Sequence, residues 1–343
     1  MRRHIRAILA AAAILAIPMA AQANDLPILP QAADQPRPAG TRAKLRVLDW
    51  AGMRAAVSYT FDDAQPSQSE HLDELLATGA PMTEYIVSSA MQTAPDFVSS
   101  WRKAGKAGWE LGNHTGHHCP FGQACGGLAR FDAASDIDAA ERVITGTLKA
   151  PGVWTLAYPF GDTRWREATE PRVFLARGVQ PGSVAPHGGD RYNLPVFPVA
   201  QGQVARDFDQ GVDSARAQRH WLIFMFHSLR PTKADWFAGV ETSDVVANVR
   251  RTQGLRDVWI GTLADVGAYW LGQQIVEAAV AKAANPDTPQ TWRWAVPAHF
   301  PPGRMLRVRV DGGTLSQGGQ DLPWDAHGFY TVALDAGELS WRP

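Results

Sequence analysis

The sequence has little cysteine, little excess charge and few long apolar runs. Its 343 residues include two cysteines, and 33 Lys and Arg nearly balance 34 Asp and Glu. This balance excludes the clustered positive charge that nucleic-acid binding requires, so we expect no nucleic-acid partner. Beyond the first 23 residues no apolar run is long enough to span a bilayer, which predicts no membrane span in the mature chain. No glycine-rich dinucleotide turn follows any candidate strand.

The N-terminal residues have the pattern of an export signal. A short cationic start and an Ala-rich apolar run lead to small residues at Ala21 and Ala23. This arrangement predicts that residues 1–23 are a secretory signal peptide, cleaved near Ala23/Asn24, and that the mature protein is periplasmic or secreted. The alternative is a retained membrane anchor. Residues 24–43, rich in Pro, Ala and polar residues, are predicted to be a flexible lead-in.

The two cysteines lie close together, at Cys119 and Cys125. In an oxidising compartment this spacing predicts a small disulfide that closes a loop. The alternative is a metal site, for which two thiols are too few and the neighbouring histidines would supply further ligands. A disulfide would brace the segment that follows those histidines.

Strand-like and helix-like segments alternate between residues 44 and 284, which we assign to one domain. The expected strands are 55–61, 82–88, 109–114, 153–160, 196–200, 221–227 and 257–262. The expected helices are 67–79, 95–108, 133–150, 243–254 and 263–284. This alternation predicts an α/β fold, a distorted or incomplete (β/α) barrel, with a flat doubly wound sheet as the alternative. Residues 285–343 have short alternating segments between Gly- and Pro-rich turns, which predicts a small all-β unit.

Reactive side chains follow four of the predicted strands. They are Asp62 and Asp63, the histidines of residues 114–118, Asp162, and His227. The C-terminal ends of barrel strands open on the same face, where barrel enzymes carry their active sites. We therefore expect these groups to meet.

Three histidines stand within five positions in GNHTGHHC, residues 112–119. His114 and His118 have the spacing of one helix face, with His117 off that face. Two imidazoles and one carboxylate leave a position for water, as in catalytic zinc sites. Because neighbouring side chains at a strand end diverge, one of the two aspartates could bind the metal while the other stays free as a base.

These motifs resemble one known family. Thr60-Phe61-Asp62-Asp63, His114-Thr115-x-x-His118, Tyr158-Pro159-Phe160-Gly161-Asp162 and Phe226-His227 stand in the order found in polysaccharide deacetylases, the NodB-homology enzymes of carbohydrate esterase family 4. The resemblance covers roughly residues 52–265. It implies a distorted (β/α) barrel, a divalent metal, most often Zn²⁺ but Co²⁺, Ni²⁺ or Mn²⁺ in some members, and an acetylated polysaccharide or oligosaccharide as substrate.

The resemblance also implies a role for each residue of the motifs. Asp62 would be the general base, Asp63, His114 and His118 the metal ligands, the Phe160 amide an oxyanion donor, and His227 the general acid.

The sequence departs from the family pattern in two places. Ala157 stands where many members have an arginine that orients the base, and the Asp-x-x-Asp-Trp element that tunes the acid histidine is not recognisable. By their place in the presumed upper loops, Arg164, Asp162 or Arg191 could take over the missing role. Substrate contacts are expected from Pro159, Trp165 and Arg191, with Trp236 a further candidate by position.

The sequence therefore predicts a secreted metal-dependent deacetylase of an acetylated glycan, with amide and ester substrates equally open. Two alternatives remain. One is a non-catalytic glycan-binding protein on a degenerate deacetylase barrel, and the other is a metal hydrolase of another small amide or ester. The C-terminal β unit is interpreted as a lid or packing module, with carbohydrate binding as its alternative.

Overall fold

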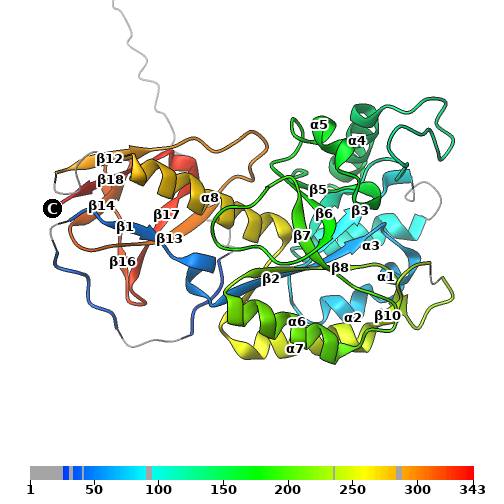
Figure 1. Cartoon of the computed structure of the whole chain (residues 1–343), viewed down its shortest axis with the longest axis horizontal. Helices are drawn as coiled ribbons and strands as arrows, with labels where there is room; N and C mark the ends of the chain where they lie inside the picture. Colours follow the sequence, from blue (N-terminus) through cyan, green and yellow to red (C-terminus); the bar gives the residue numbers. More distant parts are fainter. Residues whose placement is uncertain (1–25, 31–33, 41, 90–94, 235, 283–287) are drawn as a thin grey trace, which may run out of the picture.

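The structure, a computed structural model, describes residues 26–30, 34–40, 42–89, 95–234, 236–282 and 288–343. The predicted signal peptide lies outside the described residues. Within the part that is described, no helix is both long enough and apolar enough to cross a membrane. Figure 1 shows a helix-covered barrel joined through α8 to a β-rich C-terminal unit.

Seven parallel strands close into a barrel because β8 pairs back onto β2. In ring order they are β2 (Ala55–Asp62), β3 (Thr83–Ile86), β4 (Glu110–Asn113), β5 (Thr155–Ala157), β6 (Leu175–Pro181), β7 (Leu194–Pro198) and β8 (Trp221–Phe226). A further parallel strand, β11 (Val258–Ile260), pairs with the first half of β2, while β3 pairs with its second half. The predicted distorted (β/α) barrel is confirmed. Strand β6 was not predicted.

Helices cover the outside of this ring (Figure 1). They are α1 (Pro66–Glu70), α2 (Leu72–Leu76), α3 (Pro95–Lys106), α4 (Ala133–Arg142), α5 (Arg166–Thr169), α6 (Ala205–Gln218), α7 (Thr242–Leu255) and α8 (Leu263–Ala281). Short 3-10 turns cover Asp49–Gly52, Pro159–Gly161, Thr163–Trp165 and Leu334–Ala336, and a small parallel pair joins β9 (Leu229–Arg230) to β10 (Val240–Glu241). The predicted helix 133–150 is α4 followed by a π-helical turn over Val143–Thr147.

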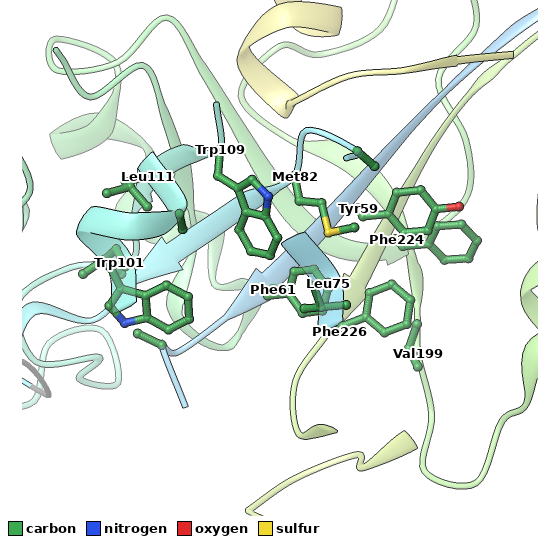
Figure 2. Close-up of a cluster of buried hydrophobic side chains, with 14 of the residues drawn as sticks. Tyr59, Phe61, Leu75, Met82, Trp101, Trp109, Leu111, Val199, Phe224 and Phe226 are labelled. Carbon is green, nitrogen blue, oxygen red and sulfur yellow. The ribbon is translucent and has the colours of Figure 1, made fainter. Parts of the chain in front are cut away.

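Alternation along the strands separates the core from the site. On β2, Tyr59 and Phe61 point outward and stack on Phe224 and Phe226 of β8, as Figure 2 shows. The Tyr59 hydroxyl donates a hydrogen bond to Asn248 of α7. Because successive strand residues face opposite sides, the residues between them point into the barrel. The barrel interior therefore receives Asp62 at the end of the strand.

The C-terminal unit consists of two four-stranded antiparallel sheets, as predicted for an all-β unit. One sheet has the order β1 (Leu45–Val47), β13 (Met305–Val310), β17 (Phe329–Ala333) and β16 (Trp324–Asp325), and the other has β12 (Gln290–Arg293), β18 (Glu338–Arg342), β14 (Thr314–Gln317) and β15 (Gln320–Asp321). Strand β1 comes from the start of the segment predicted to be barrel.

The segment before β1 also contacts this unit. The Gln35 N–H donates to the Ala326 carbonyl, and the Gly40 N–H donates to the Asp311 carbonyl. These backbone hydrogen bonds place Gln35 and Gly40 along the C-terminal sheets, and the flexible lead-in over residues 24–43 stays a prediction. Pairing between such distant segments leaves no local sequence signal.

Candidate active site and metal centre

The two aspartates are separated by a tight turn at the end of β2. Asp63 and Ala64 have φ values of 78° and 54°, in the left-handed region. This backbone keeps Asp62 inside the barrel and turns Asp63 toward the mouth. The Gln65 amide donates to Asp63 Oδ2 at 3.0 Å, so Oδ1 is the oxygen left facing the histidines. The predicted divergence of the two carboxylates is observed.

The histidines lie on a turn, and the interpretation of their spacing as one helix face is wrong. Thr115 and His118 have φ values of 68° and 52°. The Asn113 side chain accepts the Thr115 N–H at 2.8 Å, and the Thr115 hydroxyl accepts the His118 N–H at 3.0 Å. These local bonds, formed as β4 ends, bring the imidazoles of His114 and His118 to within 4.6 Å of each other, measured between ring centroids.

Asp63, His114 and His118 converge on one point. Asp63 Oδ1 lies 3.4 Å from His114 Nε2 and 3.6 Å from His118 Nε2. One ligand atom from each of the three residues lies within 4.8 Å of the others. Tetrahedral donors placed about 2.1 Å from a zinc ion stand roughly 3.4 Å apart, so this set fits a small divalent cation.

A hydrogen bond fixes the orientation and tautomer of His114. Its Nδ1 lies 2.8 Å from the carbonyl oxygen of Ala157. A carbonyl only accepts, so Nδ1 carries the hydrogen, and in the neutral ring Nε2 keeps a free lone pair. Metal-ligating histidines commonly donate their other N–H in this way. The donor set therefore fits a metal site in chemistry as well as in geometry.

Burial and neighbouring charges shift the pKa values of Asp63, His114 and His118 in different directions. Burial alone would raise the pKa of Asp63, but the hydrogen bond and charge of His114 lower that pKa below its usual range. Burial and the nearby charge of His114 lower the pKa of His118 to about 4. For His114, burial lowers the pKa but the contacts with Asp63 and Asp62 raise it overall. A deprotonated carboxylate and a neutral imidazole are the forms that coordinate a cation.

Asp62 contacts an arginine that no motif pointed to. Arg177 of β6 donates from Nη2 to Asp62 Oδ1, and its guanidinium lies 4.6 Å from the centroid of the Tyr85 ring. Its side chain is fully buried, and Asp62 is 3% exposed. Arg177 therefore stands beside the carboxylate where Ala157 provides no side chain able to reach it.

The three residues considered as substitutes for the missing arginine do something else. Arg164 and Asp162 bond to each other at 3.0 Å. Arg191 places its guanidinium 4.6 Å from the centroid of the Tyr192 ring. Arg177 stands in the position that the prediction gave to one of those three residues. Its strand was missed because the run LARGVQP is interrupted by Arg and Gly and ends in Pro.

His227 lies on the other side of Asp62. Its Nε2 is 4.0 Å from Asp62 Oδ2, which is also 3.9 Å from His114 Nε2. Burial lowers the pKa of His227. Its Nδ1 has no hydrogen-bond partner among the described residues. The Gln68 amide ties the ends of β2 and β8 together by donating to the backbone carbonyls of Asp62 and His227.

Phe160 and its neighbours form a strained turn after β5. Phe160 has a φ of 57°, its ring lies 4.5 Å from that of His118, and its side chain is 62% exposed. The following Gly161 also has a positive φ, and a Cβ there would lie 2.2 Å from Val179. The turn therefore needs glycine at this position. Pro159, an expected substrate contact, is buried beneath the turn.

Trp165, also expected to contact substrate, is fully buried. It packs edge-on against Phe121 and Phe131, with ring centroids 5.7 and 5.3 Å apart. The prediction that Trp165 contacts substrate is therefore wrong, for a simple reason. The tryptophan follows the motif closely in sequence, but the Thr163–Trp165 turn directs it into the core.

The predicted disulfide between Cys119 and Cys125 is present, with Cα atoms 5.5 Å apart. Both thiols are therefore consumed, and the alternative of a cysteine metal site is excluded. His117 points away from the other histidines and pairs with the buried Asp136 of α4, at 2.6 Å. The turn that carries His118 is thus held by a helix on one side and a disulfide on the other.

A buried acid that the sequence reasoning missed lies beside the two aspartates. Glu84 of β3 is fully buried and accepts the Ala64 N–H through Oε1 at 3.1 Å. Burial and the charge of Asp62 raise its pKa well above the ordinary value. Its Oε2 has no partner among the described residues. The available signal was a glutamate within the apolar strand 82–88.

Residues 51–170 match the family model for polysaccharide deacetylase. The match includes the first three of the four motifs, so the resemblance predicted from those residues is confirmed. Among curated proteins, none matches the chain.

Several solved structures are similar. One is a Mycobacterium smegmatis protein assigned to the polysaccharide deacetylases, with 13% identity, a TM-score of 0.48, and coverage of 72% of this chain and 96% of that one. A second is a family 4 acetyl xylan esterase from Clostridium thermocellum with a cobalt ion, with 13% identity, a TM-score of 0.42, and coverage of 63% and 91%. A third is a family 4 pseudoenzyme from Bacillus anthracis, with 12% identity, a TM-score of 0.39, and coverage of 62% and 64%. At these values the likeness assigns no function.

Proposed function

We propose that this chain is an exported, metal-dependent hydrolase that removes acetyl groups from a glycan. The observation that carries the proposal is the convergence of Asp63, His114 and His118 at the barrel mouth, with Asp62 and His227 beside them. The glycan as substrate class rests on the family match over residues 51–170. N-acetyl and O-acetyl substrates need the same groups, so both belong to the proposal.

Asp63, His114 and His118 would hold the divalent cation, with Zn²⁺ first and Co²⁺, Ni²⁺ or Mn²⁺ as alternatives. When bound, such a cation would supply Lewis-acid chemistry, since it acidifies water and polarises a carbonyl. The ligand residues would need little rearrangement. Gln65 already directs Oδ1 of Asp63 toward the imidazoles, and the Ala157 carbonyl already fixes the His114 ring.

Asp62 would act as the general base. Its Oδ1 is held by Arg177, which leaves Oδ2 facing the space between His114 and His227. A carboxylate fixed in this way can take a proton from an attacking water without a cost of reorientation. Arg177 would stabilise the ionised form of the base and so act as a positioning residue.

Phe160 and His227 would act on the acetyl carbonyl and on the leaving group. The strained Phe160 turn would present its backbone N–H to the developing oxyanion, since fixed amide donors stabilise such charge strongly. His227 would donate a proton to the departing nitrogen or oxygen. Burial lowers the pKa of His227, so its protonated form is a stronger acid but a minor species at neutral pH, and His227 would have to take up the proton that it donates during the reaction.

The test combines metal analysis with acetate release from the purified mature chain. The substrates would be N-acetylchitohexaose, peptidoglycan and acetylated xylan. We expect bound divalent metal and acetate from at least one glycan. Asp62→Asn should keep the metal and lose at least about 100-fold in rate, as expected for loss of a general base. His118→Ala should lose metal and activity together.

His187→Ala is the matched control, because His187 is 60% exposed and pairs with Glu277 away from the site. It should leave metal content and rate unchanged. Bound metal with no acetate from any of the glycans would contradict the proposal. That result would favour a glycan-binding protein or a hydrolase of another small amide or ester.

A further inference from the structure

A cavity of about 700 Å³ lies at the bottom of the barrel, away from the proposed metal ligands. It is found where β4 and β5 begin, whereas Asp63 and His114 follow the ends of their strands. Its walls come from the second half of α3, the turn that leads into β5, the start of α8 and, in the C-terminal unit, Arg304. The proposed catalytic residues all lie outside this lining. A volume of this size is typical of small-ligand sites, so the cavity is a candidate for a second binding site.

Positive charge dominates the lining of this cavity. Four of the lining side chains are cationic and two are acidic. Of the two acids, Asp265 is paired with Arg304, and Glu110 is buried and accepts three hydrogen bonds from its neighbours in the fold. Three cations line the cavity with no ion-pair partner among the described residues: Arg102, Lys106 and Lys149. Positive charge that is not compensated within the fold attracts an anion.

The Arg102 guanidinium is held in place at the wall of the cavity. Its Nε donates to the Thr147 carbonyl at 2.8 Å, a bond that ties α3 to the π-helical turn. This bond leaves the two Nη groups available to a carboxylate or a phosphate. A guanidinium that is already fixed loses little further freedom when it binds an anion. Lys106 lies four residues further along α3 and therefore on the same helix face.

Aromatic and apolar surface lies beside these cations. Trp154, just before β5, is half-buried and lines the cavity together with Trp109 and Leu148. A Cβ on Gly152 would lie 2.4 Å from Cη2 of Trp154, so the indole ring needs the space that a glycine leaves there. The cavity therefore offers an aromatic surface next to positive charge. This combination suits a ring-shaped ligand that carries an anionic group.

We propose that this cavity is a binding site for an acidic sugar, a pyranose that carries a carboxylate or a phosphate group. Arg102, Lys106 and Lys149 would bind the anionic group through charge-assisted hydrogen bonds. Trp154 would contact an apolar face of the ring. That the ring is a sugar rests on the proposed function, because a chain that acts on a glycan works among sugars. The site would hold the protein on acidic material at a position separate from the catalytic groups.

The dimensions of the cavity favour a small anion over a macromolecular surface. A stable protein interface needs about 800 Å² per partner with a continuous apolar centre, and a nucleic-acid surface needs many phosphate contacts. This lining instead gathers a few cations around one hollow. A nucleotide would combine an aromatic base with the same anionic group, so the experiment includes one as a competing ligand.

The experiment measures binding to the purified mature chain by isothermal titration calorimetry. The ligands are trigalacturonate for the carboxylate, glucose 6-phosphate for the phosphate, neutral N-acetylchitotriose and adenosine monophosphate. We expect at least one acidic sugar to bind, and to bind more weakly at high salt. In Lys106→Ala/Lys149→Ala the Kd for that sugar should rise at least about 10-fold, because hydrogen bonds to charged groups contribute strongly. The Kd for N-acetylchitotriose should stay the same.

Lys44→Ala/Lys282→Ala is the matched control, because both lysines are exposed and neither lines the cavity. It removes the same charge and should leave the Kd for the acidic sugar unchanged. Trp154→Ala should raise that Kd about 10-fold, since it removes the aromatic surface. An unchanged Kd in Trp154→Ala would overturn the contact with a sugar ring.

No binding of either acidic sugar by the wild type, or an equal loss in the control variant, would overturn the site itself. Tighter binding of adenosine monophosphate than of both acidic sugars would overturn the assignment of the ligand as a sugar. Metal content and turnover of 4-nitrophenyl acetate report separately on the proposed catalytic centre, and both should be the same in wild type and in the lysine variants.

Discussion

Each end of the barrel contains a buried glutamate, and the two glutamates differ in how many hydrogen bonds they accept. At the bottom, Glu110 of β4 accepts hydrogen bonds from the hydroxyls of Thr83 and Thr155 and from the Ala264 N–H at the start of α8, at 2.6 to 3.0 Å. At the mouth, Glu84 of the adjacent strand accepts one bond and leaves Oε2 without a partner among the described residues. One carboxyl group is saturated, and the other is not.

The same contrast extends to the neighbouring groups. At the bottom, Thr83 also accepts the Leu263 N–H at 2.8 Å, so β3, β4 and the start of α8 share one network. At the mouth, buried nitrogen atoms of Arg177 and His227 have no partner in the described part of the chain. A buried polar group without a partner costs stability. The bottom of the barrel is therefore built for stability, whereas the mouth keeps unsatisfied groups where the proposed chemistry would take place.

The largest expected effect comes from removing the Arg177 guanidinium, whose charge compensates that of the buried Asp62 at the barrel mouth. Arg177→Met leaves the Asp62 carboxylate buried without its cation, which disfavours the ionised base. We expect kcat/KM at pH 7 to fall about 100-fold and the acidic limb of the pH–rate profile to move to higher pH. Breaking a buried ion pair should also cost about 3 to 5 kcal/mol of unfolding free energy.

Arg177→Lys should restore part of the rate and return the acidic limb toward its original position, because it restores the charge without the planar geometry. A rate loss with an unshifted pH profile would mean that Arg177 acts on packing alone. The pH profile, not the rate, therefore decides between the two roles.

The second-largest effect is expected from a substitution of Glu110 at the bottom of the barrel. At pH 5 Glu110 is protonated and needs an acceptor for one hydrogen, which the Thr155 hydroxyl can become by rotating. The NH₂ of Glu110→Gln brings a second hydrogen against groups that donate, which should lower the unfolding free energy at pH 5 by about 1 to 3 kcal/mol. Burial raises the pKa of Glu110 to about 7, against which its hydrogen bonds act only in part. A raised pKa means that the folded state binds the proton more tightly. The stability that Glu110 contributes is therefore full below about pH 4.5 and is lost as the pH rises through about 7.

The wild type should consequently lose up to about 3 kcal/mol relative to Glu110→Gln between pH 4.5 and pH 8. Chemical denaturation of both proteins across this range measures the difference directly. A difference that stays constant with pH would show that Glu110 remains ionised throughout.

The smallest effect is expected from the equivalent change at the mouth. Burial and the charge of Asp62 raise the pKa of Glu84 well above its ordinary value, which favours the neutral acid that glutamine resembles. Its carbonyl oxygen can still accept the Ala64 N–H, and its NH₂ replaces Oε2, which has no partner among the residues that the structure describes. We expect Glu84→Gln to change the unfolding free energy by less than about 1 kcal/mol, measured beside Glu110→Gln. A loss as large as that of Glu110→Gln would remove the contrast between the two ends.

Local sequence was sufficient for the motif residues at the mouth. Asp63, His114 and His118 lie at the ends of strands whose apolar runs are clear, and the barrel rule then brings them together. The turn that carries His118 was misinterpreted as a helix, since the side chains of Asn113 and Thr115 satisfy its backbone. Spacing alone does not distinguish the two conformations.

The residues that sequence reasoning missed come from elements with weak signals. Arg177 lies on β6, whose short run LARGVQP contains an arginine, a glycine and a proline and does not read as a buried strand. The arginine is tolerated there because Asp62 and the Tyr85 ring are its neighbours, and neither is visible in the local sequence. The prediction for Trp165 was wrong for the reverse reason. This residue is close to a motif in sequence, but that closeness did not place it near the site in space.

Strand β1 joins the beginning of the folded chain to its end, since Leu45 pairs with Val310. During synthesis the first strand emerges long before its partner does. It stays an unpaired apolar segment until the barrel residues and then β13 have been synthesised. A chain stopped after α8 would retain every proposed catalytic residue and still expose an open sheet edge, which invites aggregation.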